Sequence, residues 1–337
     1  NKMPRAVNLA RHPTGAVRPE DFEVVEAPRP EVPEGWFLIK NRVFSLDAGF
    51  RQWMSAGAGD NYLTGMQLNE PVQSIVLGEV VESRHPDYAV GTLVNARTAW
   101  EEMSLLDGTD LCSPLLAADD MALSEYMSTL GPTGMTAWLG LNHIGQPKSG
   151  DVVVVSAAGG AVGTIVGQLA KAAGCRTIGL VSSAAKAQWL TDEVGYDLAI
   201  SREAHPDLAQ ALIEAAPEGI DIFFDNVGGS VLNTVMQHLQ EGARLVLCGA
   251  ISQYEAEVEP VSHTWELITK RARMEGFMFS DYTDEFPAVI EAMEKLLRAG
   301  ELKTFDQCYQ GIEQTPTAFC DMMSGASRGK CLVVLED

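Results

Sequence analysis

A glycine-rich turn is the segment of this sequence with the clearest capacity for chemistry. Residues 157–163, Ala-Ala-Gly-Gly-Ala-Val-Gly, follow the apolar run at 152–155 and precede a helical pattern. Small residues let the backbone approach a phosphate, and the first N–H groups of the helix bind the anion. The first glycine of the usual GxGxxG pattern is replaced by Ala158. The turn predicts that a dinucleotide is held by its pyrophosphate, the alternative being a tight structural turn. The expected contacts are Gly160, Ala161, Val162 and Gly163.

The end of the next strand indicates which dinucleotide binds. In sites for NAD, an acidic side chain roughly 20 residues past the glycines accepts the ribose hydroxyls. The stretch at 179–186 has no carboxylate and offers Ser182 and Lys186. Hydroxyls and an ammonium accept a 2′-phosphate through charge-assisted hydrogen bonds, whereas a carboxylate repels it. We therefore expect NADPH, with Arg202 as a second cation. The alternative is that Lys186 and Arg202 are ordinary exposed surface side chains that do not contact a cofactor.

The elements around the turn alternate between strands and helices. Continuous β-branched runs without alternation are typical of buried parallel strands, and apolar residues at helical spacing indicate the helices between them. We expect strands at 152–156, 177–181, 198–200, 220–224, 244–248 and 274–279. We expect helices after the turn (ending at Gly174) and at 184–194, 206–215, 231–239 and 286–299. This repeated pattern predicts the α/β class with a doubly wound parallel sheet.

The first part of the chain has a different character. Short apolar segments at 36–40, 74–81 and 91–96 are separated by Pro and Gly, which predicts a β-rich domain before residue 123. The last 35 or so residues return to short elements and end in a strand expected at 330–335. The sequence thus predicts a second, β-rich domain beside the Rossmann sheet.

Composition narrows the possible functions. The 337 residues carry 46 acidic and 24 basic side chains, a net charge of −22, which argues against a nucleic-acid or anionic-membrane surface. No apolar run is long enough to span a bilayer and no signal pattern begins the chain, so we expect a cytoplasmic protein. The six cysteines form no CxxC pair and the six histidines no HExxH motif. We therefore expect no disulfide framework and no metal.

Several separated motifs in one order support a family resemblance that covers nearly the whole chain. They are GPTGMTAW at 131–138, the turn with GQLAK at 167–171, DNVGG at 225–229 and CGAISQY at 248–254. With these motifs the chain resembles the zinc-independent medium-chain dehydrogenase/reductases. Within that family it is most similar to the leukotriene B4 dehydrogenase/prostaglandin reductases and to alkenal and curcumin reductases.

The resemblance implies a domain plan and a cofactor site. It implies a GroES-like domain at 1–122, a Rossmann domain at 123–300 and a segment at 301–337 that returns to the first domain, with a cleft between the domains and a homodimeric assembly. It places the 2′-phosphate at Lys186, with Arg202 where relatives often have a tyrosine, and Ser327 where they often have an asparagine. The remaining cofactor contacts that it implies are Thr136, Asn226, Cys248, Gly249, Ile251, Tyr254, Phe277, Met278 and Phe279.

Two departures from related sequences bear on the chemistry. Where zinc-dependent relatives have a cysteine ligand and a Gly-His-Glu motif, this chain reads Ser-Leu-Asp-Ala at 45–48 and Leu-Gly-Glu at 77–79. The Asp-Pro-Tyr-Met-Arg of the relatives' substrate site reads Asp-Ala-Gly-Phe-Arg at 47–51. Loss of the Pro-Tyr pair implies a reshaped pocket. The candidates to line it are Phe50, Arg51, Trp53 and Tyr62. The alternatives are that Trp53 and Tyr62 pack a surface loop and that Arg51 braces a turn with Asp47.

The expected reaction is metal-free reduction of an activated C=C bond. Hydride would reach the β-carbon of an α,β-unsaturated ketone or aldehyde, and the resulting enolate oxygen would need hydrogen-bond donors. Tyr254 is the candidate to donate to that oxygen or to supply the proton; the alternative is that it only packs against the cofactor. Quinone or carbonyl reduction on the same scaffold is the second hypothesis, and a non-catalytic NADPH sensor the third.

Overall fold

The computed structural model describes residues 2–335, which form two compact units. The first unit contains the residues up to Met127, the segment Gln307–Ser327 and the residues from Cys331 onward. The second unit contains Ser128–Asp306 and Arg328–Lys330. Each unit is described below by itself.

The first unit is built on antiparallel strands. Its seven-stranded sheet has the order β14-β15-β3-β4-β5-β7, with β6 paired to β3, and β1 and β2 form a separate ribbon. The strands are β1 (Arg5–Leu9), β2 (Phe22–Glu26), β3 (Phe37–Ser45), β4 (Gln73–Ser83), β5 (Leu93–Ala99), β6 (Met103–Leu106), β7 (Cys112–Leu115), β14 (Asp306–Gln310) and β15 (Lys330–Val334). The helical segments are η1 (Pro19–Asp21), η2 (Ala48–Met54), η3 (Leu123–Met127), η8 (Ile312–Gln314) and α8 (Thr315–Met323).

Aromatic packing anchors the core of this first unit. The ring centroid of Trp100 lies 5.7 Å from that of Phe22 and 5.3 Å from that of Phe319. Trp100 and Phe319 are fully buried. Because Phe319 belongs to α8, this packing fixes the late helix to strands near the start of the chain.

The second unit is a six-stranded parallel sheet of order β10-β9-β8-β11-β12-β13. The strands are β8 (Val152–Val155), β9 (Arg176–Val181), β10 (Leu198–Ser201), β11 (Ile220–Asp225), β12 (Leu239–Leu247) and β13 (Arg273–Gly276). The helices are α1 (Pro132–Leu139), η4 (Gly140–Gly145), α2 (Ala161–Ala172), α3 (Ala184–Trp189), η5 (Leu190–Val194), α4 (Leu208–Ala215), α5 (Gly229–Met236), η6 (Ile251–Gln253), α6 (Thr264–Thr269), η7 (Phe279–Glu285) and α7 (Phe286–Arg298). This doubly wound order confirms the predicted fold class.

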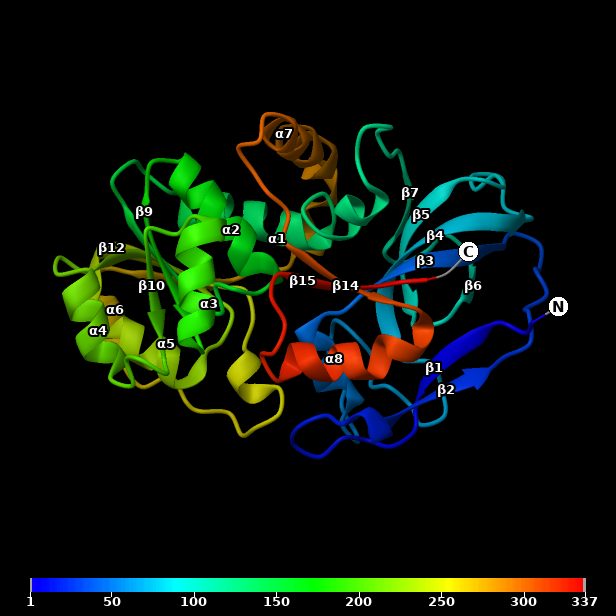
Figure 1. The fold of residues 1–337 in the computed structure, drawn as a ribbon, viewed down its shortest axis with the longest axis horizontal. Helices are drawn as coiled ribbons and strands as arrows, with labels where there is room; N and C mark the ends of the chain where they lie inside the picture. Colours follow the sequence, from blue (N-terminus) through cyan, green and yellow to red (C-terminus); the bar gives the residue numbers. More distant parts are fainter. Residues whose placement is uncertain (1, 336–337) are drawn as a thin grey trace. The chain divides into compact units, whose positions relative to one another are not determined.

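Helices cover both faces of the parallel sheet. A buried cluster joins Val154, Ile178 and Phe223 of the strands to Leu212 of α4 and Val235 of α5. On the other side α2 contacts β8 and β9, and it also contacts α1, which in turn contacts α7. Figure 1 shows these two helical layers, with α4, α5 and α6 on one side and α1, α2 and α7 on the other. A sheet buried on both faces explains the continuous apolar runs of its strands.

Three element boundaries differ from the sequence predictions. The helix expected at 184–194 is divided into α3 and the wider-turned η5, which ends at Gly195 in the left-handed conformation (φ 94°). Strand β12 begins at Leu239 rather than at 244. Leu239 already pairs with Ile220 of β11, and the register shifts before the pairing continues. Strand β13 ends at Gly276 rather than at 279, because Phe279 begins η7.

Candidate functional site

The glycine turn joins β8 to α2 as predicted. Ala157 leaves the strand in the left-handed conformation (φ 47°), and Gly160 is the N-cap of α2 without any side-chain cap. The first N–H groups of a helix have no intrahelical acceptor, so they remain available to an external anion. A Cβ on Gly163 would lie 2.6 Å from both the carbonyl oxygen of Ala157 and the Cα of Ala158. Gly163 is therefore required for the close packing of this turn, and the turn fits a bound pyrophosphate.

Tyr196 fixes the helix that follows the turn. Its hydroxyl donates to the carbonyl oxygen of Gly163 at 2.6 Å, and the side chain is fully enclosed. A Cβ on Gly167 would lie 2.2 Å from the Tyr196 ring. The sequence analysis did not identify this tyrosine, which lies 33 residues from Gly163 and is connected to α2 by no local pattern.

The segment Arg328–Lys330 supplies a further contact that the sequence did not reveal. The N–H of Gly329 donates to the carbonyl oxygen of Gly159 at 2.8 Å, and Gly329 and Gly160 form an isolated bridge. Gly329 has φ 68°, and a Cβ there would lie 2.0 Å from the carbonyl oxygen of Phe305. The guanidinium of Arg328 stacks on the Trp189 ring at 5.3 Å. A cation is thereby brought close to the turn from the far end of the chain.

The candidates for the 2′-phosphate gather around the start of α3. Ser182 is exposed, and Lys186 is half-buried with its side chain beside Gly159. Ser183 caps α3, since its Oγ accepts the N–H of Lys186 at 3.1 Å. Arg202 is exposed, and its N–H donates to the carbonyl oxygen of Val181 at 3.0 Å. The structure thus brings the two predicted cations to neighbouring strand ends.

One carboxylate joins this group although the sequence stretch at 179–186 has none. Glu203 Oε2 accepts the N–H of Ala184 at 3.1 Å, which places an acid at the N-terminus of α3. Its backbone N–H also donates to the carbonyl oxygen of Ser182 at 3.2 Å. The expectation that no carboxylate lies near this position was therefore incomplete, because the acid arrives from the end of β10 rather than from the second strand.

A buried carboxylate organises the neighbouring end of β11. Asp225 is fully buried, and its Oδ1 accepts hydrogen bonds from Ser156 Oγ at 2.8 Å and from the N–H of Val227 at 2.9 Å. The N–H of Gly228 donates to both carboxylate oxygens at 3.0 and 3.1 Å. Burial raises the pKa of Asp225, while these donors act in the opposite direction. The group therefore holds the turn at 225–229 in one conformation.

Asn226, a predicted cofactor contact, belongs to the same network. Its Nδ2 donates to the carbonyl oxygen of Ser156 at 2.9 Å, and its backbone N–H donates to Ser156 Oγ at 2.8 Å. Its carbonyl oxygen accepts the N–H of Ile251 at 3.1 Å. Asn226 thus connects the ends of β8 and β11 to the segment after β12.

The segment at 248–254 is folded back on itself at the end of β12. The N–H groups of Cys248 and Gly249 donate to the carbonyl oxygen of Asp225 at 2.9 and 3.1 Å. The N–H of Ala250 donates to the hydroxyl oxygen of Tyr254 at 2.9 Å, so the phenolic hydrogen stays available for another acceptor. Burial raises the pKa of Tyr254 above its ordinary value of 10.0. Tyr254 is therefore a neutral donor at physiological pH.

The other predicted cofactor residues of this unit lie on three different elements. Thr136 is half-buried in α1, and its hydroxyl donates to the carbonyl oxygen of Pro132 at 2.8 Å. Phe277 packs between Phe224, with ring centroids 6.5 Å apart, and Gly140, where a Cβ would lie 2.5 Å from its ring. The half-buried residues Met278 and Phe279 follow it. Ser327 is buried in the first unit, and its cofactor contact stays a prediction.

The predicted substrate residues form an aromatic cluster in the first unit. The ring of Trp53 lies 5.5 Å from that of Phe50 and 5.6 Å from that of Tyr62. Asp60 accepts the indole N–H of Trp53 at 3.1 Å, and Arg97 stacks on Tyr62 at 5.1 Å. The sequence did not single out Asp60 or Arg97. Burial is the main cause that raises the pKa of Tyr62.

Arg51 has a supporting position rather than an exposed one. It is 2% exposed, and its guanidinium donates to Ser55 Oγ at 2.8 Å and to the carbonyl oxygen of Gly15 at 2.7 Å. Asp47 accepts the hydroxyl of Ser45 at 2.7 Å. These contacts brace the turns around η2.

Residues 2–335 contain no group of three or more His, Cys, Asp or Glu side chains arranged to hold a metal ion. Over the same residues, no helix combines the length and apolarity needed to cross a membrane. The six cysteines are free thiols.

Comparisons with known proteins agree with this architecture. A family model described as the N-terminal domain of oxidoreductase matches residues 5–113, and one described as zinc-binding dehydrogenase matches residues 161–295. The 2-alkenal reductase (NADP(+)-dependent) of Nicotiana tabacum is 36% identical over 98% of this chain and 97% of its own. The NADPH-dependent curcumin reductase of Escherichia coli is 33% identical over 96% and 95%.

A solved structure extends the similarity to three dimensions. The crystal structure of CurA from Vibrio vulnificus in complex with NADPH is 35% identical, with a TM-score of 0.91 over 99% of each chain. A Rossmann sheet with a glycine turn in one unit and an antiparallel sheet in the other, together with these relatives, define the class as an oxidoreductase. The chain belongs to the medium-chain dehydrogenase/reductase family, among relatives that include alkenal, prostaglandin and curcumin reductases. The predicted family resemblance is confirmed.

Proposed function

We propose that this protein is an NADPH-dependent, metal-free reductase of C=C bonds conjugated to a carbonyl. The observation that carries the proposal is the uncapped N-terminus of α2 at Gly160, with Lys186 beside the same turn. Such a site suits a pyrophosphate and a 2′-phosphate of one dinucleotide. The printed names of relatives that reduce alkenals and curcumin with NADP(H) support the same cofactor and the same reaction class.

In this proposal the residues of the second unit bind and orient the cofactor. The N–H groups at the start of α2 hold the pyrophosphate, and Lys186, Ser182 and Arg202 hold the 2′-phosphate. Asn226, the segment at 248–254 and the residues 277–279 face the ribose and nicotinamide. NADPH, when bound, supplies the hydride.

The proposed role of Tyr254 concerns the oxygen of the substrate. Hydride addition at the β-carbon moves the electron pair of the C=C bond toward the carbonyl, so negative charge develops on that oxygen. Tyr254 then gives its phenolic proton to the oxygen, which forms an enol. The α-carbon of the enol takes a proton from water and the hydroxyl proton returns to Tyr254, which gives the saturated product. Its bond from Ala250 leaves this hydrogen available.

We assign substrate contacts to the aromatic cluster of the first unit, which we propose is the GroES-like domain. Phe50, Trp53 and Tyr62 offer apolar faces, and the buried Arg51 holds η2 in place through its hydrogen bonds to Ser55 Oγ and to the carbonyl oxygen of Gly15. An aromatic lining suits a conjugated, largely apolar substrate.

Reductase assays with three kinds of acceptor test the proposed function. NADPH oxidation is followed with an α,β-unsaturated ketone, a quinone and a saturated aldehyde, and the products are identified by mass spectrometry. We expect a saturated ketone from the enone, with deuterium from C4-labelled NADPH at its β-carbon. Turnover of the quinone alone favours quinone reduction, and tight NADPH binding without any turnover favours a sensor.

We also propose that the protein is a homodimer joined through its second unit. Strand β13 forms one edge of the parallel sheet, and the neighbouring segment exposes Val258, Val261, Trp265 and Ile268 by 65%, 45%, 67% and 63%. Large apolar side chains exposed together on a soluble surface mark an association site. Light scattering should give twice the monomer mass, and Trp265→Glu should shift it to the monomer. Monomeric wild-type protein at micromolar concentration contradicts the assignment.

We propose the cytoplasm as its compartment. The support is chemical: the six cysteines are free thiols, and a reducing compartment keeps thiols in that state. Fractionation of cells that produce the protein tests this directly.

A further inference from the structure

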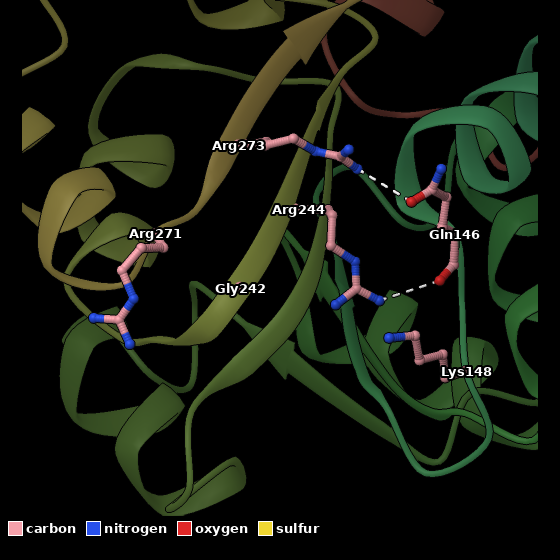
Figure 2. Close-up of a pocket in the computed structure, with 6 residues that line it drawn as sticks. All are labelled: Gln146, Lys148, Gly242, Arg244, Arg271 and Arg273. Carbon is pink, nitrogen blue, oxygen red and sulfur yellow. Dashed lines mark hydrogen bonds between the residues drawn. The ribbon is translucent and has the colours of Figure 1, made fainter.

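Positive charges gather at the amino-terminal end of the parallel sheet in the second unit. A pocket of about 290 Å³ lies there, and the residues that line it are Gln146, Lys148, Gly242, Arg244, Arg271 and Arg273. Figure 2 shows Arg244, Arg273 and Lys148 grouped around Gln146, with Arg271 directed away from them. Four of the six lining residues are cations, and none is an acid.

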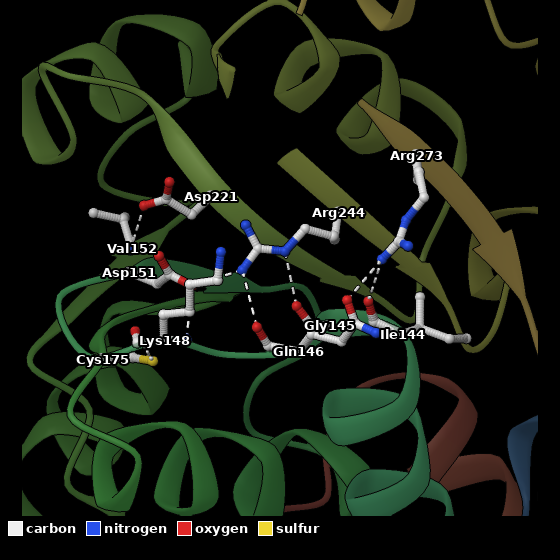
Figure 3. Close-up of polar contacts among 10 residues, drawn as sticks. All are labelled: Ile144, Gly145, Gln146, Lys148, Asp151, Val152, Cys175, Asp221, Arg244 and Arg273. Carbon is white, nitrogen blue, oxygen red and sulfur yellow. Dashed lines mark hydrogen bonds and ion pairs between the residues drawn. The ribbon is translucent and has the colours of Figure 1, made fainter. Parts of the chain in front are cut away.

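Arg244 is held rigidly at the base of this group. Its Nε donates to the carbonyl oxygen of Gly145 at 2.8 Å, and its Nη2 donates to the carbonyl oxygen of Gln146 at 3.2 Å and to Asp151 at 2.6 Å. The side chain is 12% exposed. Figure 3 shows these bonds converging on one side of the guanidinium. Because these bonds hold Nε and Nη2, they also fix the direction of Nη1. A ligand that binds Nη1 therefore costs the Arg244 side chain little further conformational entropy.

Arg273 extends the same arrangement from β13. Its Nη2 donates to the carbonyl oxygen of Ile144 at 3.1 Å and to Oε1 of Gln146 at 3.4 Å. Both acceptors are neutral oxygens, so these bonds position the guanidinium without cancelling its charge. The remaining N–H groups of Arg273 are free to bind a ligand.

The charge balance leaves an excess of positive charge. Asp151 pairs with Arg244, and Glu241 pairs with Arg271. Among residues 2–335, Arg273 and Lys148 form no ion pair with a carboxylate. Asp221 also interacts with Arg244, so the group of four cations and three carboxylates keeps one excess positive charge. This excess creates a local positive potential that attracts small anions.

We propose that this pocket binds a phosphate group, carried either by inorganic phosphate or by a small phosphomonoester. Arg273 and Arg244 offer planar N–H donors that match phosphate oxygens, and Lys148 adds a flexible ammonium. The pocket is separate from the glycine turn. Asp151 precedes β8 and the turn follows it, so the two sites lie at opposite ends of the strand. The bound anion would bridge the end of η4 to β12 and β13, and it would therefore stabilise the second unit.

Calorimetric titration of inorganic phosphate into the protein saturated with NADP⁺ tests this inference, with chloride replacing phosphate at constant ionic strength as the control. We expect one saturable site. Arg273→Gln and Lys148→Gln should each weaken binding about tenfold, corresponding to about 1.4 kcal/mol. Lys295→Gln, which removes a cation from the exposed surface of α7, should leave the affinity unchanged. Phosphate should also raise Tm in the wild type and less so in the two pocket variants.

A second titration with glycerol phosphate distinguishes the two sources of the phosphate group. Tighter binding of the ester indicates a phosphorylated metabolite, and tighter binding of phosphate indicates the free ion.

Absence of saturable binding overturns the inference, as does equal binding by wild type and both pocket variants. A parallel titration without NADP⁺ provides a further check. Phosphate binding that is lost in Lys186→Gln, or that is present without NADP⁺ and lost when NADP⁺ is added, assigns the phosphate to the cofactor site and also overturns the inference. If Arg273→Gln does not fold, Lys148→Gln remains decisive, since its side chain makes no hydrogen bond within the described residues.

Discussion

Ser156 and Asp225 join the carboxyl ends of two adjacent strands, β8 and β11, through a hydrogen bond of 2.8 Å from Ser156 Oγ to Asp225 Oδ1. Both side chains are at most 1% exposed. The carboxylate also binds the N–H groups of Val227 and Gly228, and Ser156 Oγ accepts the N–H of Asn226. The pair thus positions the turn that we assign to the nicotinamide side of the cofactor.

Ser156→Ala should separate this positioning role from simple cofactor binding. Loss of the hydroxyl removes the acceptor of the Asn226 N–H and one donor to the Asp225 carboxylate, both of which are buried. This should lower the free energy of unfolding by about 1–3 kcal/mol. We expect kcat for the enone to fall more than the affinity for NADPH, because the pyrophosphate site at α2 is unchanged. Chemical denaturation and fluorescence titration measure the two quantities. Thr164→Ala, a buried hydroxyl on α2 outside this network, serves as the matched control. A loss of NADPH affinity with unchanged kcat contradicts the role.

Ala157→Gly should stabilise the protein. Ala157 has φ 47°, where a Cβ costs about 1–2 kcal/mol, and glycine removes that strain although it loses more entropy on folding. The expected net gain is up to about 1 kcal/mol in unfolding free energy, measured by denaturant titration. Ala292→Gly, in the middle of α7, should instead destabilise by about 0.5–1 kcal/mol. Equal losses in the two variants would show that Ala157 is not strained.

Glu203→Gln should increase the preference for NADPH over NADH. The Glu203 carboxylate lies at the N-terminus of α3. In the proposed site it would repel a 2′-phosphate bound by Lys186. Removing its charge should lower KM for NADPH by a few-fold and leave KM for NADH unchanged or higher. Lys186→Gln should have the opposite effect on NADPH.

Steady-state kinetics with both cofactors measure this preference. Glu214→Gln, on the exposed side of α4, is the control for a change of net charge alone. An equal effect on the two cofactors in Glu203→Gln would contradict a contact near the 2′-phosphate.

Tyr254 should determine the alkaline limb of the pH profile. Burial raises its pKa above 10.0, so the donating, protonated form persists below pH 10 and is lost only as pH rises through the raised value. Single-turnover rates with an enone should therefore be flat from pH 7 to about 10, as far as this group is concerned.

Tyr254→Phe should lower the single-turnover rate about 10²-fold or more without altering NADPH affinity, as expected for loss of a positioned acid. Tyr282→Phe, a tyrosine of η7 that stacks on His143, provides a matched control. An unchanged rate in Tyr254→Phe removes the proposed acid role.

The local features of the fold were predictable from short stretches of sequence. The run at 152–155, the glycine turn and the apolar spacing of α2 lie within about 20 residues, and backbone sterics with burial on both sheet faces fix their order and conformation. The resemblance to the family followed from motifs of five to eight residues. Boundaries were less accurate where distant partners decide them, as at β12, whose early start depends on pairing with Ile220.

The sequence by itself determined the parallel sheet, the glycine turn between β8 and α2 and the family to which the chain belongs, because each depends on residues close together in the chain. Only the tertiary structure brought Gly329 to Gly159, Tyr196 to Gly163 and Glu203 to the start of α3. It alone also assembled Lys148, Arg244, Arg271 and Arg273 around one pocket. The residues in these contacts are far apart in the sequence, so no local pattern predicts that they meet. They become neighbours because the strands lie side by side in the sheet and the core packs as a whole.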